Sequence, residues 1–105
     1  YSVSCAALNQ MTKSLAVAFA NDGIRVNAIS LGSIMSSSLR LNLHSNPELQ
    51  DSIIDATPLG YIAEPEEVAD LALFLSSNSA SFLTGQVITI DGGRSILNKL
   101  EKPAY

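Results

Sequence analysis

The feature that constrains the fold most is a long amphipathic helical pattern that leads, through a glycine turn, straight into a short apolar strand pattern. The apolar residues of the helical part recur at spacings of three and four, which predicts a helix over residues 1–20. They are Leu8, Met11, Leu15 and Phe19. Gly23 suits the end of that helix, and residues 24–31 have the composition of a strand packed on both faces. Helix, turn and buried strand make half of a βαβ unit, which predicts an α/β fold with a parallel sheet whose other strands precede residue 1.

A second helix and strand are predicted further along the chain. Pro65 suits the first helical position, and Glu66 and Glu67 favour the positive end of a helix dipole, so a helix is predicted over 65–77. β-branched residues bounded by glycines predict a strand over 86–91. Adjacent glutamates do not face each other on a helix, so we interpret this pair as a helix start and not as a catalytic acid and base.

The remaining segments carry weaker signals. Within residues 37–57, Leu39, Leu41 and Leu43 alternate with polar residues, whereas Pro47 indicates the start of a short helix. His44 stands without a neighbouring carboxylate, so we assign it neither a metal nor a general-base role. The Asp91-Gly92-Gly93 run is interpreted as a turn and not as a phosphate loop, and residues 94–105 as a mixed tail.

Composition excludes several functional classes. The 105 residues suffice for one domain, and the net charge of −4 provides no basic face for nucleic acid. The apolar runs fall far short of the roughly 20 residues that span a bilayer, so no membrane insertion is expected. Cys5 is the one cysteine and cannot form an internal disulfide, which favours a reducing, cytoplasmic location.

The first five residues carry a resemblance to a known family. Tyr1-Ser2-Val3-Ser4-Cys5 resembles the active-site signature of the short-chain dehydrogenases/reductases, in which a tyrosine, three residues and a lysine open a helix. Tyr1 matches the tyrosine, whereas Cys5 stands where the lysine belongs. Three more motifs resemble the family in the right order, within residues 24–29, 57–69 and 84–93. The resemblance implies the C-terminal portion of a doubly wound, Rossmann-like domain that starts at the active-site tyrosine.

The same resemblance implies roles for other residues. In the family a Pro-Gly turn and a threonine lie over the nicotinamide, and here Gly32 and Ser36 stand at matching positions. It implies cofactor contacts from Gly32, Ile34 and Ser36, with NAD or NADP as cofactor, and a lid over residues 33–57 that closes on a small carbonyl or alcohol substrate. It also implies a homo-oligomer assembled through the first helix and through the last helix and strand.

Two hypotheses follow for the function. In the first, the chain is part of an NAD(P)-dependent oxidoreductase in which Tyr1 is the acid/base, impaired because Cys5 supplies no cation to lower the phenol pKa from about 10. Lys13 is no substitute, because twelve residues along a helix span roughly 18 Å. The family's glycine-rich turn and orienting serine belong upstream of residue 1, so the chain alone is expected to bind cofactor poorly and to be inactive. In the second, it is a non-catalytic interaction module that docks on a dehydrogenase-like partner.

Overall fold

The structure, a computed structural model, describes residues 1–96; residues 97–105, which include most of the predicted tail, lie outside the described residues. The chain divides into two compact units. The first unit comprises Tyr1–Ser30 and Val68–Thr89, and the second comprises Leu31–Glu67 and Ile90–Tyr105.

The first unit opens with helix α1, Ser2–Phe19, which lies within the predicted range of 1–20. A 3-10 turn, η1, follows over Ala20–Asp22. Gly23 then takes a left-handed conformation with φ of 71°, which a residue with a side chain rarely adopts. The glycine therefore ends the helix and turns the chain toward the sheet.

Two strands form the sheet among the described residues: β1, Ala28–Leu31, and β2, Val87–Ile90. The Ala28 amide donates to the Gln86 carbonyl over 2.8 Å, and the Gly32 amide donates to the Ile90 carbonyl over 3.0 Å. The pairing advances four residues along both strands in the same direction, so the strands are parallel. The predicted α/β fold with a parallel sheet is confirmed.

Strand β1 is shorter than the predicted 24–31, because side chains take over the hydrogen bonds before Ala28. The Val26 amide donates to Thr84 Oγ1 over 3.1 Å. The Asn27 side chain donates to the Leu83 carbonyl over 2.9 Å and accepts from the Gln86 amide over 3.1 Å. These side-chain hydrogen bonds connect the residues just before β1 to the residues just before β2, without the regular backbone pairing of a sheet.

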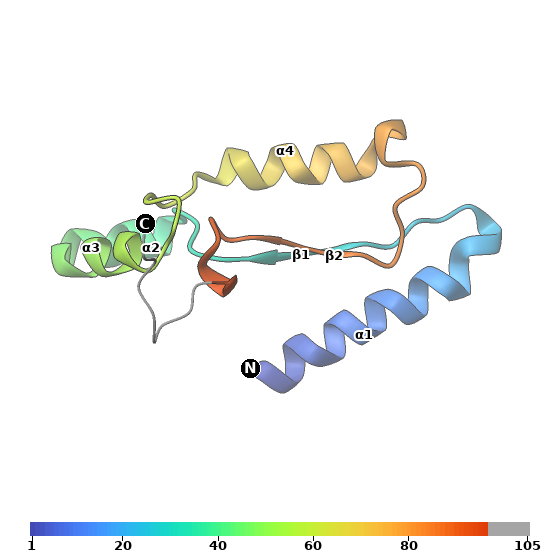
Figure 1. Cartoon of the computed structure of the whole chain (residues 1–105), viewed down its shortest axis with the longest axis horizontal. Helices are drawn as coiled ribbons and strands as arrows, with labels where there is room; N and C mark the ends of the chain where they lie inside the picture. Colours follow the sequence, from blue (N-terminus) through green and yellow to red (C-terminus); the bar gives the residue numbers. More distant parts are fainter. Residues whose placement is uncertain (97–105) are drawn as a thin grey trace. The chain divides into compact units, whose positions relative to one another are not determined.

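Helices cover both sides of the strands in the first unit. Helix α4 runs over Pro65–Ser76, compared with the predicted 65–77, and its part from Val68 onward belongs to this unit. Figure 1 shows α4 and α1 on opposite sides of β1 and β2, as in a doubly wound domain. The buried residues of this unit come from both helices and from the 3-10 turn η2, Asn78–Ala80. They are Thr12, Ala16, Leu75 and Ala80.

The second unit contains a pair of short helices, α2 over Ser37–Ser45 and α3 over Pro47–Asp55, within the segment predicted to be a lid. A parallel bridge joins Ile34, near the start of that segment, to Ala63, six residues beyond its predicted end at 57, and next to it the Met35 amide donates to the Ala63 carbonyl over 2.8 Å. A last 3-10 turn, η3, spans Arg94–Ile96. The buried residues of this unit include Leu43, Thr57 and Ile62.

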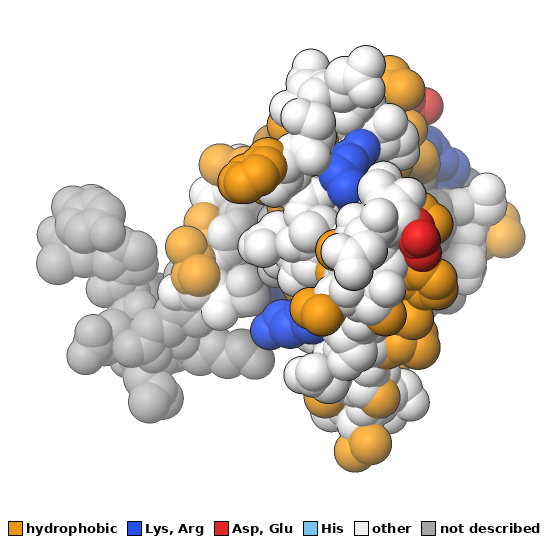
Figure 2. Space-filling view, turned by 90° about the vertical axis from the view of Figure 1, so that its right-hand side faces the viewer, with side chains coloured by type: hydrophobic (Ala, Val, Ile, Leu, Met, Phe, Trp, Pro, Cys, Tyr) orange, Lys and Arg blue, Asp and Glu red, His pale blue; other side chains and the backbone are white. Residues whose placement is uncertain are grey.

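Many large apolar side chains are exposed, above all on α1. Val3 and Val17 are about four-fifths exposed, and Leu8 and Met11 about half. Hydrophobic side chains also reach the surface, among few charged ones, on the face drawn in Figure 2. None of the helices that the structure describes is both long and apolar enough to cross a bilayer.

Candidate functional site

Tyr1 and Cys5 lie together at the start of α1. Tyr1 is the residue that precedes the helix, and its carbonyl accepts the first helical hydrogen bond, from the Cys5 amide over 2.9 Å. One helical turn separates the two residues, so their side chains share a face. Both side chains are exposed, and Tyr1 is 99% exposed. The phenol therefore points away from the packed part of its unit, where a reactant could reach it.

The thiol changes the acidity of the phenol in the direction opposite to that of a lysine. A hydrogen bond with the Cys5 side chain is the largest cause that raises the pKa of Tyr1 above its usual value, followed by charge repulsion from Cys5 and slight burial. A phenol with a raised pKa keeps its proton at neutral pH. Tyr1 can therefore donate a proton, but it accepts one only at a more alkaline pH.

Gly32, the first of the three residues predicted to contact a cofactor, follows β1 in the second unit. A Cβ atom at position 32 would lie 2.6 Å from the Cβ and 2.7 Å from the Cα of Asp91, closer than real Cβ atoms approach. The backbone after β1 therefore passes the end of β2 with no room for a side chain. Glycine is required here for close packing and not for a positive φ.

Ile34 and Ser36 are joined by their backbone. The Ser36 amide donates to the Ile34 carbonyl over 2.7 Å, which folds the chain tightly before α2 begins. The Ser36 hydroxyl then accepts a hydrogen bond from the Leu39 amide over 3.1 Å, as the N-cap of α2. Ser36 thus has two local partners before any ligand is considered.

The donor set of this loop fits a carboxamide. A serine hydroxyl has one donor and two acceptor positions. Ser36 uses one acceptor position toward Leu39, donates to no group among residues 1–96, and is exposed. Its O–H is thus free to donate to a carboxamide oxygen. The residues present fit the nicotinamide end of a dinucleotide, whereas Cys5 does not supply the cation that would bind the ribose hydroxyls.

The five predicted site residues fall into two groups. Tyr1 and Cys5 belong to the first unit and contact each other. Gly32, Ile34 and Ser36 follow one another along a single turn of the second unit. Within each group the residues are close together.

The second unit also contains a cavity that we did not predict from the sequence. It has a volume of about 140 Å³ and combines apolar walls with a few polar groups. Its lining includes Ser33, Ile34, Leu59, Tyr61, Glu67 and Asp91. Ile34 is thus both a predicted cofactor contact and a wall of this cavity.

The polar side of the cavity is organised by Glu67. The Tyr61 hydroxyl donates to Glu67 Oε1 over 2.9 Å, and the Glu64 amide donates to Glu67 Oε2 over 2.9 Å. The second contact is half of a capping box at the start of α4. The hydrogen bond to Glu67, followed by its negative charge, raises the pKa of Tyr61.

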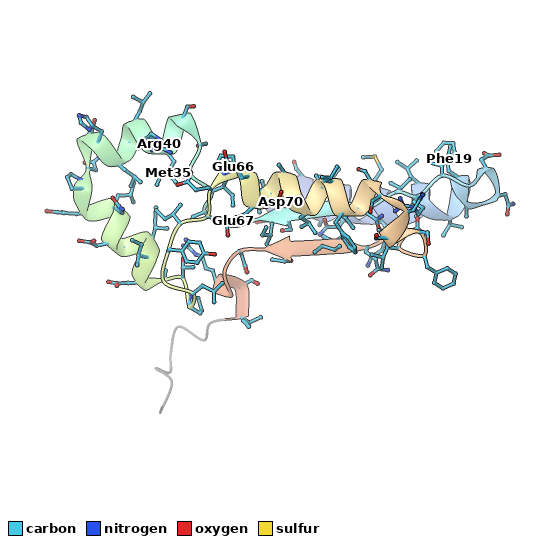
Figure 3. The ribbon with its side chains drawn as sticks, turned by 90° about the horizontal axis from the view of Figure 1, so that it is seen from above. Phe19, Met35, Arg40, Glu66, Glu67 and Asp70 are labelled. Carbon is cyan, nitrogen blue, oxygen red and sulfur yellow. The ribbon has the colours of Figure 1, made fainter. Side chains whose placement is uncertain are left out.

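Charged side chains surround the start of α4. Figure 3 shows Glu66 and Glu67 on its first turn and Arg40 on α2. Arg40 Nη2 lies 3.5 Å from Glu64 Oε2, and both side chains are more than half exposed, so this ion pair is weak. Within residues 1–96, no three His, Cys, Asp or Glu side chains gather as they would around a metal ion.

Parallel strands covered by helices on both sides, with an exposed tyrosine opening the first helix, define a Rossmann-like α/β domain. Residues 1–95 match the family model described as enoyl-(acyl carrier protein) reductase. Galactitol 2-dehydrogenase (L-tagatose-forming) of Cereibacter sphaeroides is 40% identical over 96 residues, which are 91% of this chain and 37% of that protein. The chain belongs to the short-chain dehydrogenase/reductase family and spans little more than a third of that relative's length.

Solved structures agree with this assignment. A short chain dehydrogenase family protein from Francisella tularensis has a TM-score of 0.83 and 37% identity, over 92% of this chain and 43% of that one. A 3-oxoacyl-[acyl-carrier protein] reductase from Brucella melitensis, with bound NAD, has a TM-score of 0.76 and 35% identity, over 89% and 32%. A dehydrogenase from Agrobacterium tumefaciens, with bound NADP, has a TM-score of 0.77 and 32% identity, over 85% and 36%.

Proposed function

We propose that the chain is part of an NAD(P)-dependent oxidoreductase that acts between a nicotinamide and a small carbonyl or alcohol substrate, with activity reduced by Cys5. Family membership supports the reaction class, and structural relatives with bound NAD and NADP support the cofactor class. The observation that carries the proposal is the position of Cys5, one helical turn from Tyr1, where the family has a lysine and where the thiol raises the pKa of the phenol. The acid/base group is present, whereas the charge that would tune it is absent.

A bound nicotinamide would supply or receive the hydride. Tyr1 handles the proton at its phenol oxygen: it donates to the substrate oxygen during reduction and accepts from the substrate hydroxyl during oxidation. An ordinary phenol, with a pKa of about 10, is already protonated at neutral pH, and Cys5 shifts the pKa of Tyr1 further in that direction, so Tyr1 lacks the phenolate that oxidation requires. Alcohol oxidation is therefore expected to suffer more than carbonyl reduction.

The second unit holds the residues that we propose to contact the cofactor. The Ser36 hydroxyl would donate to the carboxamide, and Gly32 and Ile34 would contact the nicotinamide end of the cofactor. Helices α2 and α3 form the lid, which would close over the substrate and exclude water.

We further propose a homo-oligomer in the cytoplasm, assembled through α1 and through α4 with β2. The proposal requires that the apolar side chains of α1, which are exposed among residues 1–96, contact another protein surface. Leu73 and Phe74 extend the same argument to α4, since they are 72% and 43% exposed.

The test is to restore the missing charge with Cys5→Lys in the full-length protein. A cation about 4 to 6 Å from a phenol lowers its pKa by about one to three units, so oxidation at neutral pH should rise by about one order of magnitude per unit. An ammonium would also donate to ribose hydroxyls, so cofactor affinity should rise too. Cys5→Met, which carries no charge, is the matched control. NAD(P)H turnover against a panel of alcohols and carbonyls is the measurement.

The alternative is a non-catalytic module that docks on a dehydrogenase-like partner. It is favoured by Cys5 in place of the catalytic lysine together with the exposed apolar face of α1. A Cys5→Lys protein that is folded and binds cofactor, yet stays as inactive as Cys5→Met, would support this alternative over the enzyme.

A further inference from the structure

The hydroxyl groups that line the cavity of the second unit mostly use their protons within the protein. The Tyr61 hydroxyl donates to Glu67 Oε1 over 2.9 Å, and the Thr57 hydroxyl donates to the Ile53 carbonyl over 2.7 Å. Both oxygens keep lone pairs that can accept a hydrogen bond. Among residues 1–96, Ser33 has the one lining hydroxyl that donates to no protein group. The polar side chains of the cavity therefore offer a ligand mainly acceptors.

Two carboxylates, Glu67 and Asp91, line the same cavity. Glu67 accepts two hydrogen bonds, and Asp91 accepts from the amides of Gly93 and Ser95 and from the Ser95 side chain. A carboxylate has about four acceptor positions, so neither group is saturated. Both residues are half-buried, where water screens a charge less than at an open surface. Within residues 1–96, the lining contains no lysine, arginine or histidine.

The charged groups around the cavity do not reverse this balance. Arg94 Nη1 lies 3.4 Å from the Ser33 hydroxyl, but Arg94 is exposed, so water screens its charge. The start of α4 favours an anion, and Glu67 already fills that role by accepting from the Glu64 amide. Arg40 pairs with Glu64, and neither residue lines the cavity. The cavity therefore favours a ligand with positive charge.

The size and the apolar walls of the cavity limit which cation fits. Its volume of about 140 Å³ is close to that of a cavity known to hold one six-carbon ring. Ile34, Leu59 and Ile90 provide aliphatic wall. A bare metal ion would leave this apolar surface without contacts. A compact aliphatic group that carries one ammonium matches the volume, the walls and the charge together.

We propose that this cavity binds a small organic cation, a protonated primary amine on a compact aliphatic body. The ammonium would donate to Glu67, to the Tyr61 oxygen and to Asp91, while the aliphatic body would lie against the apolar wall. An ammonium has three donors and no acceptor, which complements a wall of acceptors. Binding of such a cation requires neither Tyr1 nor a nicotinamide, so it can hold or fail independently of the proposed oxidoreductase activity.

The test is an NMR titration of the full-length protein at neutral pH with cyclopentylammonium and, separately, with cyclopentanol. The two ligands share one ring and have the same number of heavy atoms, but only the first carries a charge. The methyl signals of Ile34, Leu59 and Ile90 report binding at the cavity wall. Cyclopentylammonium should bind at least about ten-fold more tightly than cyclopentanol, because a hydrogen bond to a charged group contributes about that factor.

Glu67→Gln separates the charge of the cavity from its shape. Glutamine also serves at this position of a capping box, so the start of α4 is kept. The substitution should lower the affinity for cyclopentylammonium about ten-fold and change that for cyclopentanol less than about two-fold. Glu66→Gln is the matched control, since it removes an equal charge from an exposed neighbour outside the lining. It should change either affinity by less than about two-fold.

Ala63→Val tests the cavity itself, because it adds two methyl groups to the wall and valine suits the extended backbone of the bridge to Ile34. It should weaken both ligands alike, by about five-fold. This variant decides the question if Glu67→Gln does not fold, and unchanged affinities in it would place the ligands elsewhere and overturn the proposal.

Three further results would also overturn it. The first is equal affinity of the wild type for the two ligands, or no binding of cyclopentylammonium. The second is binding that leaves the methyl signals of the cavity wall unshifted. The third is an equal loss of affinity in Glu67→Gln and Glu66→Gln, which would indicate attraction by general surface charge.

Discussion

Arg25 donates from its Nη1 to the carbonyl oxygen of Leu75, which is 2.7 Å away and fifty residues further along the chain. The same guanidinium lies 3.2 Å from the Ser77 carbonyl and 3.5 Å from the Leu83 carbonyl. The last carbonyls of a helix have no partner within it, and Arg25 supplies one at the end of α4. One side chain before β1 thus hydrogen-bonds both to the end of α4 and to the loop that leads to β2.

Arg25→Met should lower the free energy of unfolding of the full-length protein by about 2 kcal/mol, because the carbonyl groups lose a charged donor. Arg25→Lys should recover only part of this loss, since an ammonium does not reproduce the guanidinium fork. Urea denaturation with an unchanged m-value is the measurement. Arg40→Met is the control, and its exposed ion pair predicts a change within about 0.5 kcal/mol. An equal effect of the two substitutions would contradict the role of Arg25.

Gly32→Ala should destabilise the protein through overlap with Asp91, by about 1 to 3 kcal/mol, as overpacking does. Gly23→Ala is the comparison, because its Cβ would meet open space and only its φ of 71° is strained, for about 1 kcal/mol. The two free energies of unfolding are compared in the full-length protein. A smaller effect at Gly32 than at Gly23 would show that the turn after β1 moves away from β2 at little cost.

Asp91 should contribute to stability at neutral pH and lose that contribution in acid. Hydrogen bonds from the Ser95 side chain and from the Ser95 and Gly93 amides lower the pKa of this carboxyl in the folded protein. A lowered folded pKa gives stability that is present above the unfolded value of about 3.9 and that disappears as the pH falls through the folded value. The difference in unfolding free energy between wild type and Asp91→Asn should therefore shrink as the pH falls below about 4. A difference that stays constant with pH would refute this.

Tyr61 should ionise only above the ordinary phenol value, because its hydroxyl donates to Glu67. A raised folded pKa gives stability that is present below about pH 10 and is lost as the pH rises through the folded value. Ultraviolet titration of phenolate, taken as the difference between wild type and Tyr61→Phe, reports this group. Glu67→Gln should bring the pKa of Tyr61 down, whereas Glu66→Gln should not, since adjacent helical residues face different ways. Equal shifts in both variants would point to general charge and not to the hydrogen bond.

The sequence predicted the fold class well because periodicity and turn chemistry are local properties. Helical spacing from Leu8 to Phe19 and β-branched residues between glycines need no knowledge of distant contacts. The start of β1 needed such knowledge. Residues 24–27 were predicted to be part of the strand. The side chain of Asn27 hydrogen-bonds to Leu83 and Gln86, however, and these bonds replace the regular backbone pairing of a strand. Those partners lie more than fifty residues away, so no local sequence pattern predicts them.

The candidate site, like the fold, was predicted only in part from the sequence. Tyr1, Cys5 and Ser36 could be named from spacing and resemblance, and their cofactor and catalytic roles stay predictions. The second contact of Ser36 was missed, because alternating leucines at 39, 41 and 43 hid the helix that Ser36 caps. The pairing of Tyr61 with Glu67 was missed as well, since it depends on how the turn before α4 folds back.

The bridge between Ile34 and Ala63 has a consequence for engineering. It closes residues 35–62 into a loop whose two ends meet, and this loop contains both α2 and α3. A loop closed in this way can be exchanged for a segment of different length with little entropic penalty, because closure entropy grows only slowly with length. We therefore expect that residues 35–62 can be replaced by the corresponding segment of a relative while Ile34 and Ala63 keep their pairing.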